Sequence, residues 1–338
     1  MHTLIYDEIY TIDNIDFEKL RNKSILITGA TGLVGTFLLG TLKRVHKTHN
    51  IKIYTWINRD IPVYMLPLFE DCIIIKGDIV ESNTIDKDIR FDYIIHAAGY
   101  GQPSKFLKDK DKTLNINTSA TTNLLKHLSY GGTFLFISSS EIYSGLCDDN
   151  ITEDMIGTTG VDHPRSCYIE GKKYGEAICS AYSDKDYNIK IARLCLAYGP
   201  GIKWDDNRVI NEFIKKGILD DNISLQDHGL ATRTYCFITD AVEMLWNITL
   251  NGKSNIYNVG GKDVISIREL AELIAHKLGK SVTFPDIDAS SVGNPKNVNI
   301  SCKLYEDEFN KTSYTPLDYG ISSTINWIKK LKEYEHNS

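Results

Sequence analysis

A tyrosine and a lysine four positions apart, Tyr168 and Lys172, are the residues of this chain best suited to proton transfer. Four residues make about one helical turn, so both side chains project from the same face of a helix. A free tyrosine has a pKa near ~10 and is a poor base at neutral pH. A lysine cation close to the phenol lowers that pKa, and a bound nicotinamide cation would lower it further. We expect the pair to remove a hydroxyl proton while a hydride leaves the same carbon.

Two further polar side chains, Ser139 and Glu141, follow residues 133–138, which we expect to form a strand. Ligands of open α/β sheets bind at the carboxyl ends of the strands. A hydroxyl at Ser139 would bond both a substrate hydroxyl and the Tyr168 oxygen. A buried carboxylate at Glu141 would have a raised pKa and would act as an acid or a base. The alternative is a serine that caps a loop beside a surface glutamate.

A glycine-rich segment follows predicted strand 24–28 and opens predicted helix 34–45. Gly29 permits a tight turn, Gly32 lets the backbone approach a phosphate, and Gly35 lets the helix lie close to the strand. The helix start then presents unpaired N–H groups to a pyrophosphate. The candidate cofactor-binding residues of this segment are Gly29, Thr31, Gly32, Leu33, Val34 and Gly35.

The ends of the next strands supply the other candidate cofactor contacts. An acid at the end of the second strand would bind the adenosine ribose, but the chain has Asn58 and Arg59 there. Arg59 favours NADP slightly over NAD, or it stacks on adenine. Asp78 and Ile79 would meet the adenine edge, unless Asp78 is an ordinary turn residue. The remaining candidates lie after the fourth strand and in the following helix: Ala97, Ala98, Gly99 and Asn117.

Composition narrows the class of protein. The chain has 338 residues, 42% of them hydrophobic, which suits a large globular domain with a smaller one. A net charge of -6 with no basic cluster argues against nucleic acid as a partner. The seven cysteines are scattered and read as reduced thiols of a cytoplasmic protein, and no metal site is predicted. We also expect no signal peptide and no membrane span.

Short apolar runs alternate with amphipathic stretches from residue 24 onward. Strands are predicted at 24–28, 51–57, 72–76, 93–96, 133–138 and 190–194, and helices at 34–45, 114–128 and 167–182. This alternation predicts an α/β Rossmann fold, a doubly wound parallel sheet, followed by a smaller mixed α/β substrate domain with helices at 209–216 and 267–278. The predicted division is an N-terminal extension 1–23, an NAD(P)-binding domain 24–195 and a substrate domain 196–338, with an interleaved boundary.

Together these motifs resemble the extended short-chain dehydrogenase/reductase family that modifies nucleotide sugars, over about residues 24–331. The segments that carry the resemblance are the glycine run, Tyr-x-x-x-Lys, Tyr198-Gly199-Pro200-Gly201, the stretch from Arg233 to Asp240, and Asn258-Val259-Gly260-Gly261. Pro164-Arg165-Ser166-Cys167-Tyr168-Ile169-Glu170-Gly171-Lys172 is most similar to UDP-glucuronate decarboxylases, and Ser139-Ser140-Glu141 to these and to GDP-mannose-type 4,6-dehydratases. One departure is Leu196, where the family usually has an asparagine that touches the substrate phosphates.

The resemblance implies a nucleoside-diphosphate sugar as substrate and a tightly bound NAD or NADP as cofactor. It implies C4 oxidation by Tyr168, with Ser139 orienting the hydroxyl and Lys172 holding the cofactor ribose. Decarboxylation or Glu141-assisted dehydration would follow, and the alternatives are a 4-epimerase, a C4 dehydrogenase/reductase or a non-catalytic dinucleotide-binding scaffold. The implied substrate-binding residues are Gln102, Ser140, Arg208 and Arg233.

The family also commonly forms homodimers through a four-helix bundle, here with helices 114–128 and 167–182. Apolar residues for such an interface are Leu124, Leu125, Ile178 and Ala181, unless they face the sheet.

Overall fold

The main feature of the protein is a seven-stranded parallel sheet, seen in a computed structural model that describes residues 2–81, 85–146, 148, 150–183, 185–286 and 297–336. The strand order is β10-β6-β5-β4-β1-β2-β3. The strands are β1 Ser24–Thr28, β2 Lys52–Ile57, β3 Ile73–Lys76, β4 Phe91–His96, β5 Leu128–Ser139, β6 Asn188–Leu194 and β10 Ile256–Val259. The predicted doubly wound α/β fold is therefore confirmed.

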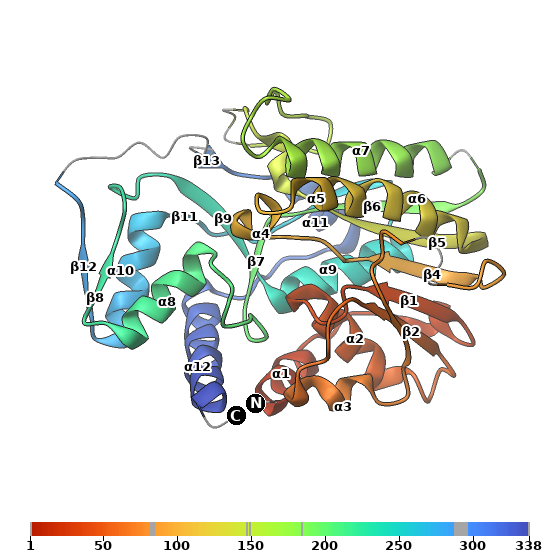
Figure 1. The fold of residues 1–338 in the computed structure, drawn as a ribbon, viewed down its shortest axis with the longest axis horizontal. Coiled ribbons are helices and arrows are strands. Elements are labelled where there is room, and N and C mark those ends of the chain that lie inside the picture. Colours follow the sequence, from red (N-terminus) through yellow and green to blue (C-terminus); the bar gives the residue numbers. More distant parts are fainter. Residues whose placement is uncertain are drawn as a thin grey trace.

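Helices cover both faces of this sheet, which explains why its central strands are almost wholly apolar. One face carries α2 (Leu33–Val45), against which α1 (His2–Tyr10), α3 (Leu66–Phe69) and α9 (Ile238–Asn251) pack (Figure 1). The other face carries α5 (Lys110–Asn117), α6 (Ser119–Lys126) and α7 (Ser166–Ser183). Ile25, Leu26 and Ile27 of β1 lie between the two layers and are fully buried.

The predicted helix 114–128 is two helices, because the chain bends at Thr118 between α5 and α6. Thr118 has φ -112° and ψ -76°, and its hydroxyl donates to the Leu114 carbonyl oxygen at 2.9 Å. The Asn117 amide donates to Thr113 O in the same way, at 2.8 Å. Side-chain bonds of this kind compete with the helical backbone bonds and bend helices. Leu128 already belongs to β5.

The second part of the protein is smaller, and its main sheet contains both parallel and antiparallel strand pairs. β7 (Leu196–Tyr198), β9 (Thr232–Phe237), β11 (Val264–Ser266) and β13 (Asn297–Val298) form one sheet, and β8 (Asn222–Ser224) pairs with β12 (Ser281–Thr283). The helices of this part are α8 (Val209–Leu219), α10 (Ile267–Leu278), α11 (Lys303–Phe309) and α12 (Leu317–His336). A Ser266–Glu269 capping box begins α10, and Gly279 in the left-handed conformation ends it.

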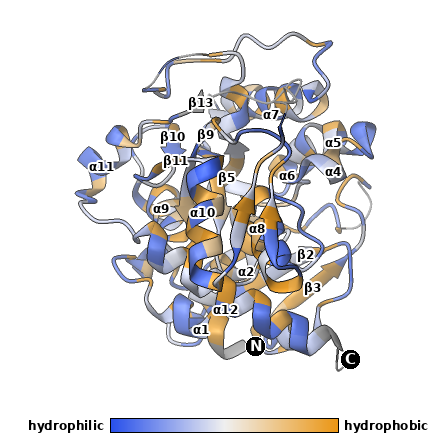
Figure 2. Ribbon diagram, turned by 90° about the vertical axis from the view of Figure 1, so that its left-hand side faces the viewer, coloured by the Kyte–Doolittle hydropathy of each residue, from blue (hydrophilic) through white to orange (hydrophobic). Residues whose placement is uncertain are grey.

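The chain crosses between the two parts more than once. After β9 it forms α9, which packs against α2, and then β10, which pairs with β6 of the large sheet. The N-terminal α1 and the C-terminal α12 lie at the same end of the molecule (Figures 1 and 2), and Glu8 of α1 bonds Tyr319 and Ser323 of α12. Within the described residues, every helix is too short or too polar to span a bilayer.

Candidate active site

The four candidate catalytic residues come from two neighbouring elements. Ser139 ends β5, Glu141 lies in the following 3-10 turn Ser140–Tyr143, and Tyr168 and Lys172 lie on α7. α7 packs directly on β5, which brings the end of the strand next to one turn of the helix. All but Glu141 are buried, and the Ser139 hydroxyl accepts from the Glu141 N–H at 3.2 Å. The predicted group is therefore assembled in the structure.

Tyr168 lies flat against a second aromatic ring. Its ring stacks on Phe106 of α4 (Pro103–Phe106), with centroids 4.7 Å apart and an interplanar angle of 9°. Burial, together with the Glu141 charge, raises the pKa of Tyr168 to about 12. A hydrogen bond with Ser139 and the charges of two arginines oppose that rise. The expected lowering of this pKa is thus wrong for the protein alone, because desolvation of the phenolate outweighs the nearby cations.

Lys172 is buried beneath Tyr168. Its Nζ donates to Ile137 O at 2.8 Å and lies 5.9 Å from the Tyr168 ring centroid. Burial lowers the pKa of Lys172 to about 8, and the charge of Glu176 opposes this shift. At neutral pH the ammonium therefore persists, with a proton that is easier to lose than that of an exposed lysine.

Glu141 forms a close ion pair with Arg165, which precedes α7. Burial raises the pKa of Glu141, whereas the charges of Arg165 and Arg233 lower it. Arg165 also lies over the Phe106 ring, 5.5 Å from its centroid, so it caps the Phe106–Tyr168 stack. We did not predict a role for Arg165, although it stands in the Pro-Arg-x-x-Tyr stretch that carries the family resemblance.

The two predicted substrate arginines lie at the same site. The Arg208 guanidinium donates to the Asp206 carboxylate from both Nε and Nη2, closest at 2.8 Å, and from Nη1 to Ala197 O at 3.1 Å. Its charge acts on Tyr168. Burial lowers the pKa of Arg233, whose charge acts on Glu141. Both guanidinium groups thus come from the second part of the chain toward the catalytic residues.

Two loops meet above these residues. Gln102 accepts from the backbone N–H of Asn207 at 3.3 Å, and Lys105 pairs with Asp205 at 3.0 Å. Ser140, also predicted to bind substrate, is buried at the end of β5. Gln102 is therefore at the border of the site, bonded to the loop that carries Arg208.

The glycine segment forms a tight cradle. Gly29 has φ +68°, and a Cβ built there would lie 2.8 Å from Ala97 O and the Ala98 backbone. A Cβ on Gly35 would lie 2.3 Å from Gly29 O. α2 begins at Leu33 without a side-chain cap from the described residues, which leaves the N–H groups near Thr31, Leu33 and Val34 for a ligand.

The end of β4 closes the space between this cradle and Lys172. The Ala98 N–H donates to Thr28 Oγ1 at 3.0 Å, and a Cβ on Gly99 would lie 3.9 Å from Lys172 Nζ. His96 bonds Thr28 and Ile116 O, and burial lowers its pKa to about 3, so it is a neutral structural residue.

Asn117 is buried near Lys172 but is not bonded to it. Its amide donates within the helix to Thr113 O at 2.8 Å, and its Oδ1 has no partner among the described residues. Gly171 packs against the same side chain, since a Cβ there would lie 3.5 Å from Asn117 Nδ2. Asn117 thus lies on α5, the helix next to the one that carries Lys172, and packs against α7 at Gly171.

The predicted adenosine contacts differ in their surroundings. Asn58 and Arg59 are exposed at the end of β2, and the Arg59 charge acts on Lys203 and Asp205. Ile79 is buried, whereas Asp78 pairs closely with Lys112 and accepts from the Val80 N–H. Those bonds hold the pKa of Asp78 below its usual value despite partial burial. Asp78 is thus bonded to Val80 in its own turn and to Lys112 of α5, and its contact with the adenine edge stays a prediction.

A buried ionic network behind Lys172 was not predicted. Glu176, one turn after Lys172, accepts from Ser138 at 2.5 Å and from Arg193 Nη2 at 2.8 Å. Arg193 also donates to the Tyr143 hydroxyl at 2.9 Å. The network joins α7, β5, β6 and the turn that carries Glu141, so it fixes the elements on which the catalytic residues stand.

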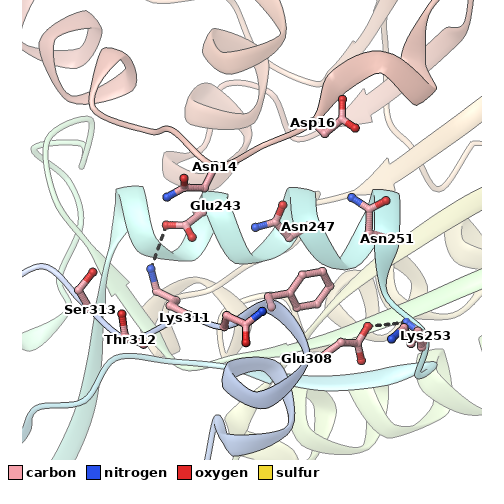
Figure 3. A pocket seen from close by; sticks show the side chains of 12 residues that line it. Asn14, Asp16, Glu243, Asn247, Asn251, Lys253, Glu308, Lys311, Thr312 and Ser313 are labelled. Carbon is pink, nitrogen blue, oxygen red and sulfur yellow. Dashed lines mark hydrogen bonds and ion pairs between the residues drawn. The ribbon is translucent and has the colours of Figure 1, made fainter.

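A cavity of about 560 Å³ lies elsewhere, between α9, the segment before β1 and the end of α11 (Figure 3). Its walls include Glu243, Asn247 and Asn251, from successive turns of α9. Lys311 bonds Glu243 at 2.9 Å, and Glu308 accepts from the backbone N–H of Lys253 at 2.8 Å. Glu243, Glu308 and Lys311 thus bond within the protein, and none of the predicted site residues lines the cavity.

The sequence of this chain is similar to a known family of proteins. Residues 25–260 match the sequence profile described as the NAD dependent epimerase/dehydratase family. UDP-glucuronic acid decarboxylase 1 of Xenopus tropicalis is 27% identical over 322 residues, which cover 94% of this chain and 74% of that protein.

Two solved structures share the fold at low sequence identity. The UDP-glucuronic acid 4-epimerase from Bacillus cereus, in complex with UDP-glucuronic acid and NAD, has a TM-score of 0.74 at 22% identity and covers 91% of this chain and 99% of its own. The dTDP-glucose 4,6-dehydratase from Bacillus anthracis, in complex with NAD, has a TM-score of 0.75 at 19% identity and covers 92% and 98%. Three different reactions therefore occur among these similar proteins.

Proposed function

This chain belongs to the NAD-dependent epimerase/dehydratase family, and from that premise we propose that it oxidises a nucleoside-diphosphate sugar at C4 and then removes the C6 carboxylate as carbon dioxide. The similarity to UDP-glucuronic acid decarboxylases supports a nucleoside-diphosphate uronate as the substrate. The fold alone does not select the reaction, so the argument depends on the residues around Tyr168.

The residues of the cradle fit a nicotinamide dinucleotide. Gly29 and Gly35 leave no room for a Cβ, and the uncapped start of α2 suits a pyrophosphate. Gly99 is open toward Lys172, which would hold the nicotinamide ribose. When bound, the dinucleotide supplies the chemistry of accepting a hydride from C4 and returning it at the end.

The catalytic residues would handle the protons of this reaction. Ser139 orients the sugar 4-hydroxyl, and the Tyr168 oxygen accepts its proton as C4 becomes a ketone. The C5–C6 bond then breaks, carbon dioxide leaves, and the electron pair is held on the C4 oxygen as an enolate. A proton taken from water adds at C5 and restores the ketone, and Tyr168 returns its own proton to the C4 oxygen when C4 is reduced. Lys172 stays cationic beneath the phenol throughout.

The close ion pair between Glu141 and Arg165 is the observation that favours decarboxylation. Dehydration needs a carboxylate that removes the C5 proton, and the Glu141 carboxylate would have to give up its bond to the Arg165 guanidinium to do so. Decarboxylation needs no base at C5, because the bond that breaks is C5–C6. Ser140, in the position before Glu141, also offers no acid for a departing water.

Incubation with a panel of nucleoside-diphosphate uronates and hexoses, followed by mass spectrometry, tests the proposal. We expect a uronate to lose carbon dioxide, Tyr168→Phe to abolish the loss, and Glu141→Gln to slow it at least about tenfold, because Arg165 loses its anchor. Loss of water from a hexose would instead identify a dehydratase. No change in mass with inversion at C4 would identify an epimerase, and a difference of two hydrogens a dehydrogenase.

A further inference from the structure

The N-terminal helix α1 lies outside the family match, which begins at residue 25, yet it is built into the protein core. Ile5 and Ile9 are 1% and 0% exposed. α1 lies beside α12 (Figure 1). A loosely attached extension would not bury its apolar residues in this way.

The position of α1 on α2 is specified by a close contact. A Cβ built on Gly40 of α2 would lie 2.2 Å from Ile9 Cδ1, so Ile9 occupies the space of the missing side chain. Arg44, one turn later, donates to Ile9 O at 3.0 Å and to Ile12 O at 2.6 Å. These bonds satisfy carbonyl groups at the end of α1.

α1 is also bonded to α12. The buried Glu8 carboxylate accepts from the Ser323 hydroxyl at 2.5 Å and from the Tyr319 hydroxyl at 3.2 Å. α12 in turn holds the turn after β7, because the buried Trp327 indole donates to Ile202 O at 2.7 Å.

The three helices enclose that turn. A Cβ built on Gly201 would lie 3.4 Å from Leu33 Cδ1, 3.5 Å from Phe37 Cε2 and 3.9 Å from Ile5 Cδ1. Leu33 and Phe37 belong to α2 and Ile5 to α1. The chain leaves this turn into residues 203–208, which reach the site through the Lys105–Asp205 pair and through Arg208.

We propose that α1 is a positioning element that holds segment 199–208, and through it Arg208, in place at the active site. α1 borders the turn on one side through Ile5, which faces Gly201, and acts on it from the other side through its bonds to α12. The structural part of this inference stands without a reaction, whereas its consequence for nucleotide-sugar binding rests on the proposed function.

The Gly40→Ala variant tests the inference without changing α1 or the segment. Alanine normally stabilises a helix interior relative to glycine, so the substitution by itself should make α2 more stable. Here the new methyl group meets the Cδ1 end of Ile9, so the fully buried Ile9 side chain must repack and its hold on α1 weakens. We expect hydrogen exchange of amides in 199–208 to accelerate at least about tenfold, while amides of β1 and β4 keep their protection. The double variant Gly40→Ala with Ile9→Ala removes the clash, and its exchange should return to within about threefold of wild type.

Ile9→Ala alone is the second variant, because it loosens α1 by leaving a void rather than by a clash. It should accelerate exchange of the same segment. Unchanged exchange of 199–208 in both single variants, or equal acceleration everywhere, would overturn the inference. In turnover assays both should raise KM for the nucleotide sugar by about three- to tenfold with little change in kcat. If hydrogen exchange of 199–208 accelerates in these variants but the wild-type protein turns over no nucleotide sugar, the proposed function is refuted and the role of α1 stands.

Discussion

Tyr168 and Lys172 show how burial acts in opposite directions on an acid and a base in one site. Burial raises the pKa of Tyr168 to about 12 and lowers that of Lys172 to about 8, so each is shifted toward its neutral form. The spacing of the two residues predicted their common helix face, but it carried no information on desolvation. A cation bound next to Tyr168, such as an oxidised nicotinamide, would therefore be needed to favour the phenolate.

The lowered pKa of Lys172 predicts a dependence of stability on pH. Between pH 8 and 10.5, the folded and usual pKa values of Lys172, the unfolded chain binds more protons than the folded one. Raising the pH through that window should therefore stabilise wild-type protein relative to Lys172→Met by up to roughly 3 kcal/mol, at about 1.4 kcal/mol per pKa unit. Urea unfolding of both proteins across this range measures the difference. Parallel curves would mean that Lys172 is not desolvated.

Arg59 predicts the choice of cofactor. Its exposed guanidinium stands at the end of β2, where the chain lacks an acid for a ribose hydroxyl. We expect Arg59→Ala to weaken NADP binding about tenfold and to leave NAD binding within about twofold, because only NADP carries the 2′-phosphate that a guanidinium can bind. Calorimetric titration of both dinucleotides measures this. Equal losses would place Arg59 against the adenine ring instead.

At the scale of elements, helices and strands with a regular apolar pattern were predicted well. The pairing of strands that are far apart in the sequence was not. β1 and α10 lie where the apolar pattern placed them, at 24–28 and 267–278, because each has one unbroken period. The bend at Thr118 was missed because it depends on side-chain bonds to backbone oxygens. β10 was not assigned to the large sheet, since four residues alone cannot indicate which strand they join.

The start of α2 yields a prediction about backbone contact. An alanine Cβ at Gly35 would lie 2.3 Å from Gly29 O and 2.8 Å from Ala30 Cα, and backbone atoms cannot move aside cheaply. We expect Gly35→Ala to cost more than about 3 kcal/mol of unfolding free energy and to abolish dinucleotide binding. Gly279→Ala is the control, because it meets no atom within 4 Å and only its φ of +66° is unfavourable, at about 1 kcal/mol. Similar losses at both positions, measured by chemical unfolding, would contradict the packing argument.

At the scale of the whole molecule, the site is built where the two parts of the chain meet. The motifs placed Ser139, Tyr168 and Lys172 together because they lie on neighbouring elements of one sheet domain. The stack of Phe106 on Tyr168 and the position of Arg165 over Phe106 were missed, since both depend on how the short helix α4 folds over α7. The role of α1 was also beyond the sequence, because a glycine in α2 does not reveal which side chain fills the space above it.

The outer face of α5 and α7 leads to the last prediction, the homodimer. Leu124 and Leu125, expected at that interface, are instead buried at 1% exposure against the sheet. Of the other two expected residues, Ala181 is exposed and Ile178 is half-buried. The large apolar side chains on this face include Leu114 of α5 and Tyr174 of α7, which are 38% and 61% exposed on two helices that pack together. A second copy would cover both, so light scattering should give twice 38.2 kDa for wild type.

Tyr174→Asp should shift this mass to 38.2 kDa, because a carboxylate would be buried without a partner. Leu219→Asp, equally apolar and exposed but on α8, should leave the mass unchanged. A wild-type mass of 38.2 kDa, or equal effects of both substitutions, would rule out this surface as the dimer interface.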